Sequence, residues 1–351
     1  MNNIKKIIDA DKGLKDTDPL GELLYDIENE ELEFLSTNCV PINLIFGGRP
    51  DGGIVIGGMA MVSADSQLGK SIIAANVMRN AQKKKMQVVL IDTERAFKKE
   101  TARKMGVDTS PDKLSIFRGS DIEKIETIIM KIMDKVPVDE RKNVLIVIDS
   151  WGTLMTSRAI NNALTGNDKA DFSLSVKKNN LANVCLNTGA TFMIVNHIYD
   201  NVGGFGDPIK IPGGKRITFN CENIGLCVGR SKERSTDKTK ILGNIIKIKT
   251  YKSRFSVADT QLEYKIRKKG GLDPFYGMLP DALEHGCVVK SKPGKYIRSF
   301  IENDKEIKEK DLYTGDFWGP IYKDTDFSEW LERKYQFTDD NLVDDELEGI
   351  F

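Results

Sequence analysis

The 351-residue sequence has only two histidines, and none of its five cysteines is paired as C-x-x-C. Two histidines exclude a histidine-rich metal site, and scattered cysteines are typical of reduced thiols in a cytosolic protein. Long apolar runs are also missing, because no window approaches eighteen consecutive apolar residues, so we expect no membrane span and no membrane partner. The apolar stretch at the N-terminus is too short and interrupted to predict a signal peptide.

Net charge is also absent, because 52 lysines and arginines balance 52 aspartates and glutamates, but the charges are unevenly distributed. Residues 247–269 hold eight basic residues and two acidic ones, whereas residues 338–351 hold six acidic residues and no basic one. Such runs are most often solvated faces or disordered tails. Local basic stripes nevertheless decide whether a protein attracts nucleic acid, so zero net charge does not exclude such a partner.

A short helix is predicted near the N-terminus. Asp18 and Pro19 supply an N-cap and a first helical residue, and apolar residues follow at helical spacing, at Leu20, Leu23, Leu24 and Ile27. The apolar stripe must be buried, either on the helix's own domain or on a neighbouring subunit.

Apolar strand-like runs alternate with helix-like runs through the middle of the chain. The first helix is predicted at 71–85, and a capping box formed by Ser120 and Glu123 opens another. Continuous apolar strands separated by helices indicate an α/β fold, with a mostly parallel sheet that helices cover on both faces. After about Ile224 the strands become more polar, as in antiparallel hairpins, and a smaller unit follows Gly271. The predicted parallel strands are residues 54–62, 86–92, 144–149 and 191–196.

The stretch ADSQLGKS, residues 64–71, matches the phosphate-binding pattern G-x-x-x-x-G-K-[ST], except that Ala64 stands where the first glycine belongs. The pattern indicates a phosphate-binding loop only where a strand precedes it and a helix follows it, and both are predicted here. Backbone N–H groups would then hold phosphate oxygens, Lys70 would reach the β- and γ-phosphates of ATP, and Ser71 would ligate Mg²⁺. The predicted nucleotide-binding residues are Ala64, Asp65, Ser66, Gln67, Leu68, Gly69, Lys70, Ser71 and Ile72.

Polar side chains end three other predicted strands, at the edge of a parallel sheet where ligands bind. Asp149 is predicted to hold Mg²⁺ in the Walker-B role. Glu94 is the candidate that orients and deprotonates the attacking water, and Asp92 is a weaker candidate. Asn196 and His197 can sense the γ-phosphate, although a structural role is as common for a lone histidine. With the phosphate loop, these residues indicate a nucleoside-triphosphate hydrolase.

Several stretches together resemble RecA-type recombinases, and most closely the bacteriophage branch of that family. LIDTERAF resembles the stretch with the water-activating glutamate, IVIDSWGTL the Walker-B strand, and IVNHIYD the phage form of the γ-phosphate sensor. GGKRITFNCENIGLCVGR resembles the end of the second DNA loop, and TYKSRF carries a similar basic pair. The resemblance runs from about residue 36 to 335, and its most specific stretches are GGLDPFYGML, HGCVVK and DFWGPIYK.

The resemblance implies three parts: a polymerisation arm at 1–35, a RecA-like P-loop ATPase core at 36–270, and a small C-terminal α+β domain with an acidic tail at 271–351. It also implies a filament of this chain in which ATP lies between subunits. Lys252 and Arg254 of one subunit would then act on the ATP of the next, in the manner of arginine fingers. Thr101 departs from the family, which commonly has an aromatic residue there to stack on adenine.

Two loops, at about 155–172 and 199–218, would hold single-stranded and double-stranded DNA. Glycines let the backbone approach phosphates, basic side chains add charge, and apolar side chains can wedge between bases. Mobile glycine-rich loops without a binding role are the alternative. The DNA-binding residues implied by the resemblance are Arg158, Lys169, Phe205, Lys210, Gly213, Gly214, Lys215 and Arg216.

The expected function is that of a DNA-dependent ATPase that forms filaments on single-stranded DNA and catalyses homologous pairing and strand exchange. It would serve DNA recombination, repair and replication in the cytoplasm of a bacterial host, with single-strand-binding and loader proteins as possible partners. The acidic tail would compete with DNA for the basic loops. Two alternatives remain open: a hexameric DNA helicase on the same core, and a non-catalytic paralogue that binds DNA.

Overall fold

The computed structural model describes residues 32–166, 171–200, 209–235, 237–268 and 270–337. By its contacts the chain divides into Met1–Glu33 and Phe34–Phe351. The helix predicted after Pro19 and the acidic tail lie outside the described residues. Every element described below belongs to the second unit.

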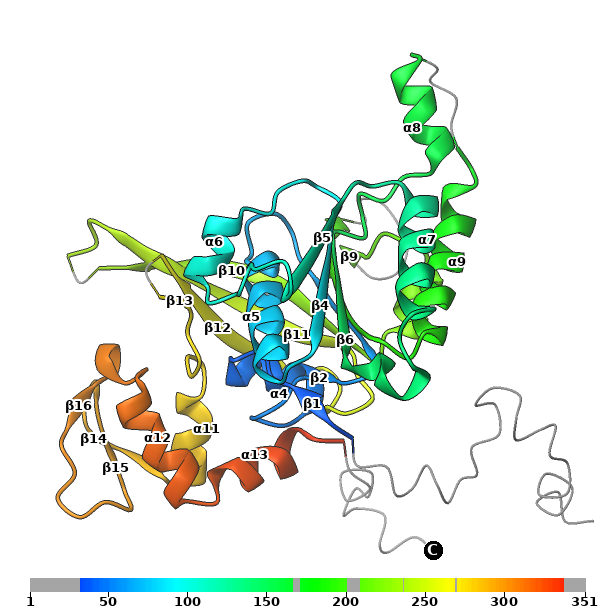
Figure 1. The fold of residues 1–351 in the computed structure, drawn as a ribbon. Coiled ribbons are helices and arrows are strands. Elements are labelled where there is room, and N and C mark those ends of the chain that lie inside the picture. Colours follow the sequence, from blue (N-terminus) through cyan, green and yellow to red (C-terminus); the bar gives the residue numbers. More distant parts are fainter. Residues whose placement is uncertain (1–31, 167–170, 201–208, 236, 269, 338–351) are drawn as a thin grey trace, which may run out of the picture. The chain divides into compact units, whose positions relative to one another are not determined.

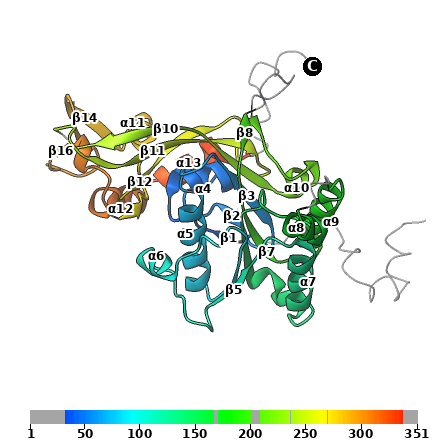
Figure 2. The ribbon, with the colours of Figure 1, turned by 90° about the horizontal axis from the view of Figure 1, so that it is seen from above.

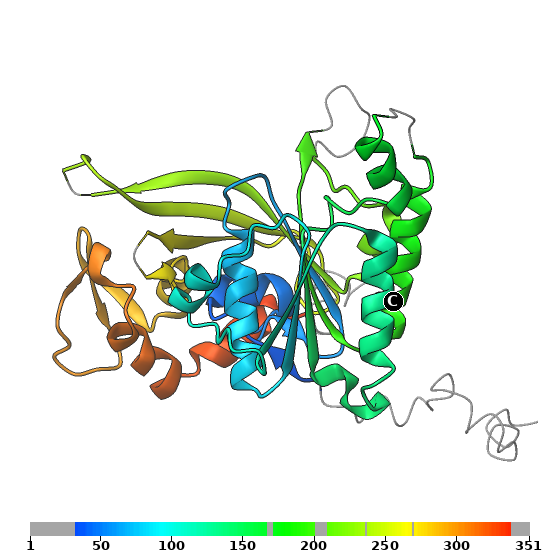
Figure 3. The same ribbon diagram turned by 45° about the horizontal axis from the view of Figure 1, so that its top comes forward.

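A nine-stranded sheet forms the centre of this unit (Figure 1). Its strands are β3 (Met59–Ser63), β4 (Gln87–Asp92), β5 (Leu114–Arg118), β6 (Val144–Asp149), β7 (Thr191–Asn196), β10 (Asn223–Arg234), β11 (Ile241–Lys252), β12 (Gln261–Arg267) and β13 (Gly271–Leu272). Their order is β13-β12-β11-β10-β3-β7-β6-β4-β5. Neighbours from β10 to β5 pair in parallel, whereas β10 to β13 pair antiparallel and β10 and β11 extend as a hairpin (Figure 3).

Helices cover both faces of this sheet, because its central strands are apolar on both sides (Figure 2). One face packs against α4 (Val40–Gly47), α5 (Lys70–Lys83) and α6 (Lys99–Lys104). The other packs against α7 (Ile122–Met133), α9 (Leu174–Asn187) and α10 (Lys215–Asn220). Helix α8 (Ser157–Leu164) projects beyond α7 and α9 (Figure 1). The predicted α/β fold, with helices on both faces and antiparallel strands after the parallel ones, is confirmed.

A small C-terminal region has its own three-stranded sheet, in the order β14-β15-β16. Its aromatic core includes Trp318 and Phe327, and Leu44 of α4 belongs to the same cluster, which ties the region to the larger sheet. The elements of this region are α11 (Leu279–His285), β14 (Val288–Lys292), β15 (Lys295–Arg298), β16 (Ile307–Lys308), a 3-10 turn (Glu309–Asp311), α12 (Gly315–Asp324) and α13 (Phe327–Tyr335).

Short paired strands and one turn complete the description. Strand β1 pairs with β2, and β8 pairs with β9. Their bounds are β1 (Phe34–Leu35), β2 (Ile54–Val55), β8 (Tyr199–Asp200) and β9 (Ile209–Lys210), and a 3-10 turn spans Val138–Asn143.

Two local predictions are wrong. The run 54–62 is not one strand, because Gly57, at φ +87°, turns the chain between β2 and β3, which lie in different sheets. Ser120 is not an N-cap, because Asp121 takes that position and accepts a hydrogen bond from the N–H of Lys124. The first helix was also predicted one residue late at its start and two residues long at its end.

Candidate nucleotide and DNA site

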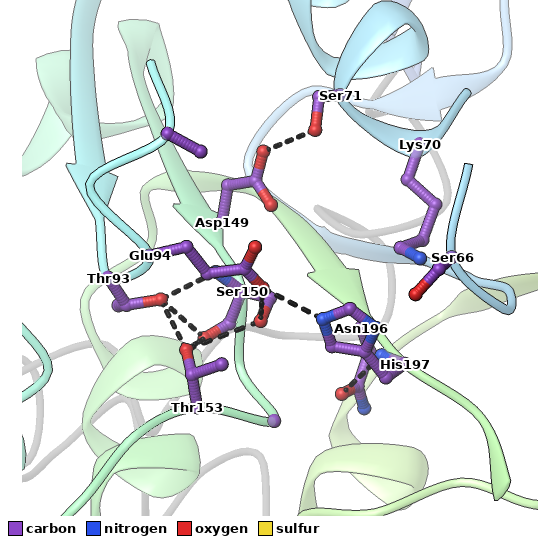
Figure 4. Close-up of polar contacts among 12 residues, drawn as sticks. Ser66, Lys70, Ser71, Thr93, Glu94, Asp149, Ser150, Thr153, Asn196 and His197 are labelled. Carbon is purple, nitrogen blue, oxygen red and sulfur yellow. Dashed lines mark hydrogen bonds and ion pairs between the residues drawn. The ribbon is translucent and has the colours of Figure 1, made fainter. Parts of the chain in front are cut away.

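The predicted phosphate loop lies between the end of β3 and the start of α5 (Figure 4). Gly69 has φ +80°, and a Cβ there would come within 2.0 Å of the Ile266 side chain, so the loop needs glycine at this position. Lys70 folds back over the loop and donates to the carbonyls of Ala64 and Asp65, both at 2.9 Å. The hydroxyl of Tyr264, on β12, donates to the Leu68 carbonyl at 2.9 Å and supports the loop from below.

Ala64 fits the loop without strain. It is fully buried in the core cluster that includes α5, and it is absent from the described residues with positive φ. Its N–H donates to the Asn196 carbonyl at the end of β7. The position therefore uses an ordinary backbone conformation, and its methyl group contributes to packing.

The structure brings Ser71 and Asp149 together, with the Ser71 hydroxyl donating to Asp149 Oδ2 at 2.8 Å. Burial raises the pKa of Asp149, and the nearby carboxylates of Glu94 and Asp92 raise it further. The hydrogen bond from Ser71 and the charge of Lys70 lower the pKa, but the net shift is upward. The carboxylates of Asp149 and Glu94 both lie near Lys70, and this excess of negative charge suits a divalent cation. Within the described residues no cluster of three or more protein ligands could hold a metal alone.

Glu94 lies between Ser150 and His197 (Figure 4). The Ser150 hydroxyl donates to Glu94 Oε1 at 2.7 Å, and His197 Nε2 lies 2.8 Å from the same oxygen. Glu94 Oε2 makes no hydrogen bond within the described part of the chain, so it can accept one from water. Burial acts to raise the pKa of Glu94, but the hydrogen bonds from His197 and Ser150 and the nearby positive charges outweigh it, and the pKa is lowered.

Asp92, the weaker candidate base, is occupied in the local fold. Its two carboxylate oxygens accept the backbone N–H groups of Ala96 and Phe97 at 3.0 and 3.1 Å, and Arg118 pairs with it at 3.4 Å. A buried carboxylate with these partners shapes the chain after β4 and is not free to move a proton. The geometry thus favours Glu94 over Asp92 as the base.

Sequence reasoning missed the residues that hold Glu94 in position. Ser150 is fully buried, and its N–H donates to Thr93 Oγ1 at 2.6 Å, while Thr93 donates back to the Ser150 carbonyl at 2.8 Å. Thr153 lies 2.6 Å from Thr93 in the same group. These hydroxyls join the ends of β4 and β6. Thr93 and Ser150 sit directly beside predicted site residues in the sequence, which was the available signal, whereas Thr153 does not.

The residues that precede the second loop make two contacts. His197 contacts Glu94, and Asn196 Nδ2 donates to the Pro212 carbonyl within the loop at 2.8 Å. Gly213 and Gly214 follow with φ +113° and +90°, and a Cβ on Gly213 would meet Trp151 at 2.4 Å. The glycines are therefore required by the turn into α10 and by its approach to Trp151.

The other predicted DNA-binding residues are dispersed over two loops. Arg158 is exposed on α8, Lys210 is exposed on β9, and both Lys215 and Arg216 are on the first turn of α10. Lys169 and Phe205 lie outside the described residues. Phe172, which the sequence reasoning did not single out, is 91% exposed at the end of the first loop. An aromatic side chain in a polar loop was its only signal.

Lys252 and Arg254 lie away from the phosphate loop. Lys252 ends β11 and pairs in register with Ile224, and its ammonium contacts the end of α10, on the sheet face opposite α5. Arg254 is exposed. Neither residue is among those that line the cavity beside Ser71 and Asp149.

A cavity opens between α5 and α6, with Ser71 and Asp149 among its lining residues. Thr101 lines it with Phe97 and Met105, so the small side chain leaves apolar space where the family commonly has an aromatic residue.

No helix in the described ranges combines the length and the apolar character that crossing a membrane requires.

Comparisons with known proteins match two family models in sequence order. Residues 16–273 match the RecA N-terminal domain, and residues 275–331 match the C-terminal domain of the bacteriophage T4 recombination and repair protein. The chain is 24% identical over 320 residues to the recombination and repair protein of Enterobacteria phage T4, covering 87% of this chain and 80% of that protein. It is 27% identical over 270 residues to RecA of Streptomyces venezuelae, and the match covers 76% of this chain and 68% of that protein.

RecA of Chlorobium limicola is a further relative, 26% identical over 266 residues, which cover 74% of this chain and 72% of that one. The first model alone matches well over half of the chain. The predicted resemblance to RecA-type recombinases, and most closely to their bacteriophage branch, is confirmed. The chain therefore belongs to the RecA family, with a C-terminal domain of the phage T4 type.

Proposed function

We propose that the protein is an ATP-dependent recombinase that assembles on single-stranded DNA and exchanges strands with a homologous duplex. One observation carries this proposal: the 2.8 Å contact between Glu94 and His197, the residue that leads into the second loop. A carboxylate that activates water is thereby joined to a segment that touches DNA. Membership of the RecA family and the phage-type C-terminal domain support the same conclusion.

The chemistry would begin with ATP on the phosphate loop. Backbone N–H groups bind the phosphates, and Lys70 leaves the two carbonyls of its own loop for phosphate oxygens. Ser71 and Asp149 would hold Mg²⁺, and the ion would supply positive charge to neutralise the phosphates. Glu94 then orients a water and takes its proton through the free Oε2, while Ser150 and His197 hold the other oxygen.

The filament part of the proposal rests on the position of the basic pair. Lys252 lies on the sheet face opposite α5, away from the nucleotide that its own subunit would bind. If it contacts a nucleotide, that nucleotide must be bound by another subunit. Action on DNA would take place in the cytoplasm of a bacterial host. Binding of single-strand-binding and loader proteins to this protein stays a prediction.

Electron microscopy with single-stranded DNA and a non-hydrolysable ATP analogue separates this function from a helicase. We expect extended helical filaments, because each subunit would offer its basic pair to the next without closing a ring. Closed hexameric rings under the same conditions would favour the helicase and contradict the proposal.

Changing Lys215 or Arg216 to alanine is expected to flatten the salt dependence of DNA binding. Each lost phosphate contact should reduce the slope of log K against log salt by about 0.7 on single strands. Fluorescence anisotropy with labelled oligonucleotides at several salt concentrations measures this slope. Lys135→Ala removes an exposed lysine at the far end of α7 and serves as the control. An unchanged slope in the first two variants would mean that the phosphate contacts lie elsewhere.

Removing the Ser150 hydroxyl is expected to change the pH dependence of ATP turnover. The base works only when ionised, so activity is lost as the pH falls through the pKa of Glu94. Ser150 is one cause of the lowered pKa, so Ser150→Ala raises it and moves the acidic limb of kcat to higher pH. Steady-state rates at pH values from below the ordinary glutamate pKa of 4.5 up to neutral pH measure the shift. A limb at the wild-type pH would contradict the assignment of Glu94 as base.

Thr101→Tyr is expected to tighten ATP binding. A tyrosine on α6 would fill part of the cavity beside Ser71 and stack its ring on the adenine of ATP. Aromatic contacts of this kind correspond to roughly two- to tenfold in affinity. Titration with a fluorescent ATP analogue measures the change. Weaker binding in a correctly folded variant would mean that the adenine does not lie against α6.

A further inference from the structure

We infer that Lys178 is a positioning residue for ATP hydrolysis: from the helix that follows the first DNA loop, it holds the turn at 150–153 and, through that turn, Glu94. The inference deepens the proposed function and rests on it for the reaction and for DNA as the ligand of the loop. Lys178 itself would touch neither ATP nor DNA.

Lys178 places a charge on the buried side of α9. The residue is only 6% exposed, and its ammonium donates to the Gly152 carbonyl at 3.1 Å. Burial lowers the pKa of the ammonium, and no carboxylate in the described part of the chain counters that effect. A buried charge without a carboxylate partner costs stability, and a methionine would fill similar space at less cost. The single polar contact of this lysine therefore points to a role other than stability.

The turn that contains Gly152 meets Glu94 on one side and the proposed γ-phosphate sensor on the other. The hydroxyl of Ser150, at the start of the turn, donates to Glu94 Oε1 at 2.7 Å. A Cβ on Gly152 would meet Asn196 Oδ1 at 3.3 Å and the His197 ring at 3.4 Å, so the backbone packs directly against both residues. A displaced Gly152 carbonyl would therefore displace Ser150 and Glu94. A misplacement of about 1 Å can cost an enzyme about a hundredfold in rate.

Helix α9 connects this turn to the first loop. It begins at Leu174, two residues after the loop, where Asp171 accepts the Ser173 N–H at 2.9 Å. The same carboxylate accepts the hydroxyl of Thr156, the N-cap of α8, so the two ends of the loop are joined just before α9 starts. Among the described residues, Lys178 makes the only hydrogen bond between α9 and the turn. DNA that moves the loop would thus act on the turn through this ammonium.

Amide hydrogen exchange without nucleotide or DNA tests the contact itself. Lys178→Met should accelerate exchange in peptides that cover 149–155 by about tenfold or more, because a charge-assisted hydrogen bond that holds the turn is lost. Lys177→Met is the matched control, because it makes the same change one residue away, at a side chain that is 40% exposed. It should match the wild type. Wild-type exchange in Lys178→Met would overturn the inference.

Steady-state ATP turnover with single-stranded DNA separates positioning from a structural role. Lys178→Met should lower kcat about tenfold or more. KM for ATP and the affinity for DNA should keep their wild-type values, because the change touches neither the phosphate loop nor a DNA contact. The midpoint of thermal unfolding should not fall, because a buried charge is removed. Lys177→Met should behave as the wild type in all four measurements.

An unchanged kcat in Lys178→Met would contradict the inference, and so would a parallel loss of turnover and thermal stability, which indicates a structural role. A wild-type protein without DNA-stimulated turnover would instead refute the proposed function. In that case the exchange measurement would still decide whether Lys178 holds the turn.

Discussion

Filaments of a Glu94→Gln variant are expected to bind ATP and DNA while hydrolysing ATP about 10² to 10⁴ times more slowly than the wild type. The amide keeps the shape of the side chain and its contacts near Ser150 and His197, but it cannot accept a proton from water. Binding of ATP uses the phosphate loop and is therefore retained. Lys70→Ala should differ by losing ATP affinity as well, because the loop then has no cation for the phosphates.

Parallel measurements of nucleotide binding and steady-state turnover distinguish these outcomes. Glu100→Gln is a matched control, because it makes the same chemical change on α6 at a side chain that is 82% exposed. Its turnover should equal that of the wild type. Near-normal hydrolysis by Glu94→Gln would transfer the role of base to another group and remove the centre of the proposed mechanism.

Arg254→Ala is expected to reduce ATP turnover in filaments by about 10³ to 10⁵, the range found when a phosphoryl-transfer site loses an arginine finger. The affinity of an isolated subunit for ATP should be unchanged, because Arg254 lies away from its own phosphate loop. The loss should therefore appear only under conditions in which subunits assemble. Light scattering to follow assembly, together with turnover in the same sample, measures both quantities.

Mixing variants shows whether Arg254 acts on a neighbour. Arg254→Ala subunits keep an intact Glu94, and Glu94→Gln subunits keep an intact Arg254, so mixed filaments should contain sites with both groups. Turnover of the mixture should exceed that of either variant alone by at least about tenfold. A mixture no more active than its components would contradict action between subunits.

The sequence was sufficient to predict the strands that matter most for the site. Residues 144–149 and 191–196 are continuous apolar runs, and both coincide with strands of the sheet. Buried parallel strands have this pattern because both of their faces pack against helices. Their ends carry Asp149 and Asn196, so the meeting of Asp149 with Ser71 follows from the topology.

Other features depend on contacts that no local pattern encodes. Asp121 rather than Ser120 caps α7, and both its carboxylate and that of Glu123 also accept hydrogen bonds from Ser157, far along the chain. The apparent capping box is therefore used to hold the start of α8. Likewise, the choice between Asp92 and Glu94 depends on which carboxylate the following backbone occupies, and that is visible only in three dimensions.

The most direct test of the central claim is strand exchange measured together with ATP turnover. Circular single-stranded DNA, a homologous linear duplex, Mg²⁺ and ATP are incubated with the purified protein. We predict that single-stranded DNA stimulates hydrolysis and that joint molecules form with homologous duplex and not with an unrelated one. DNA-stimulated hydrolysis with duplex unwinding but no homology-dependent joint molecules would contradict the account and favour a helicase.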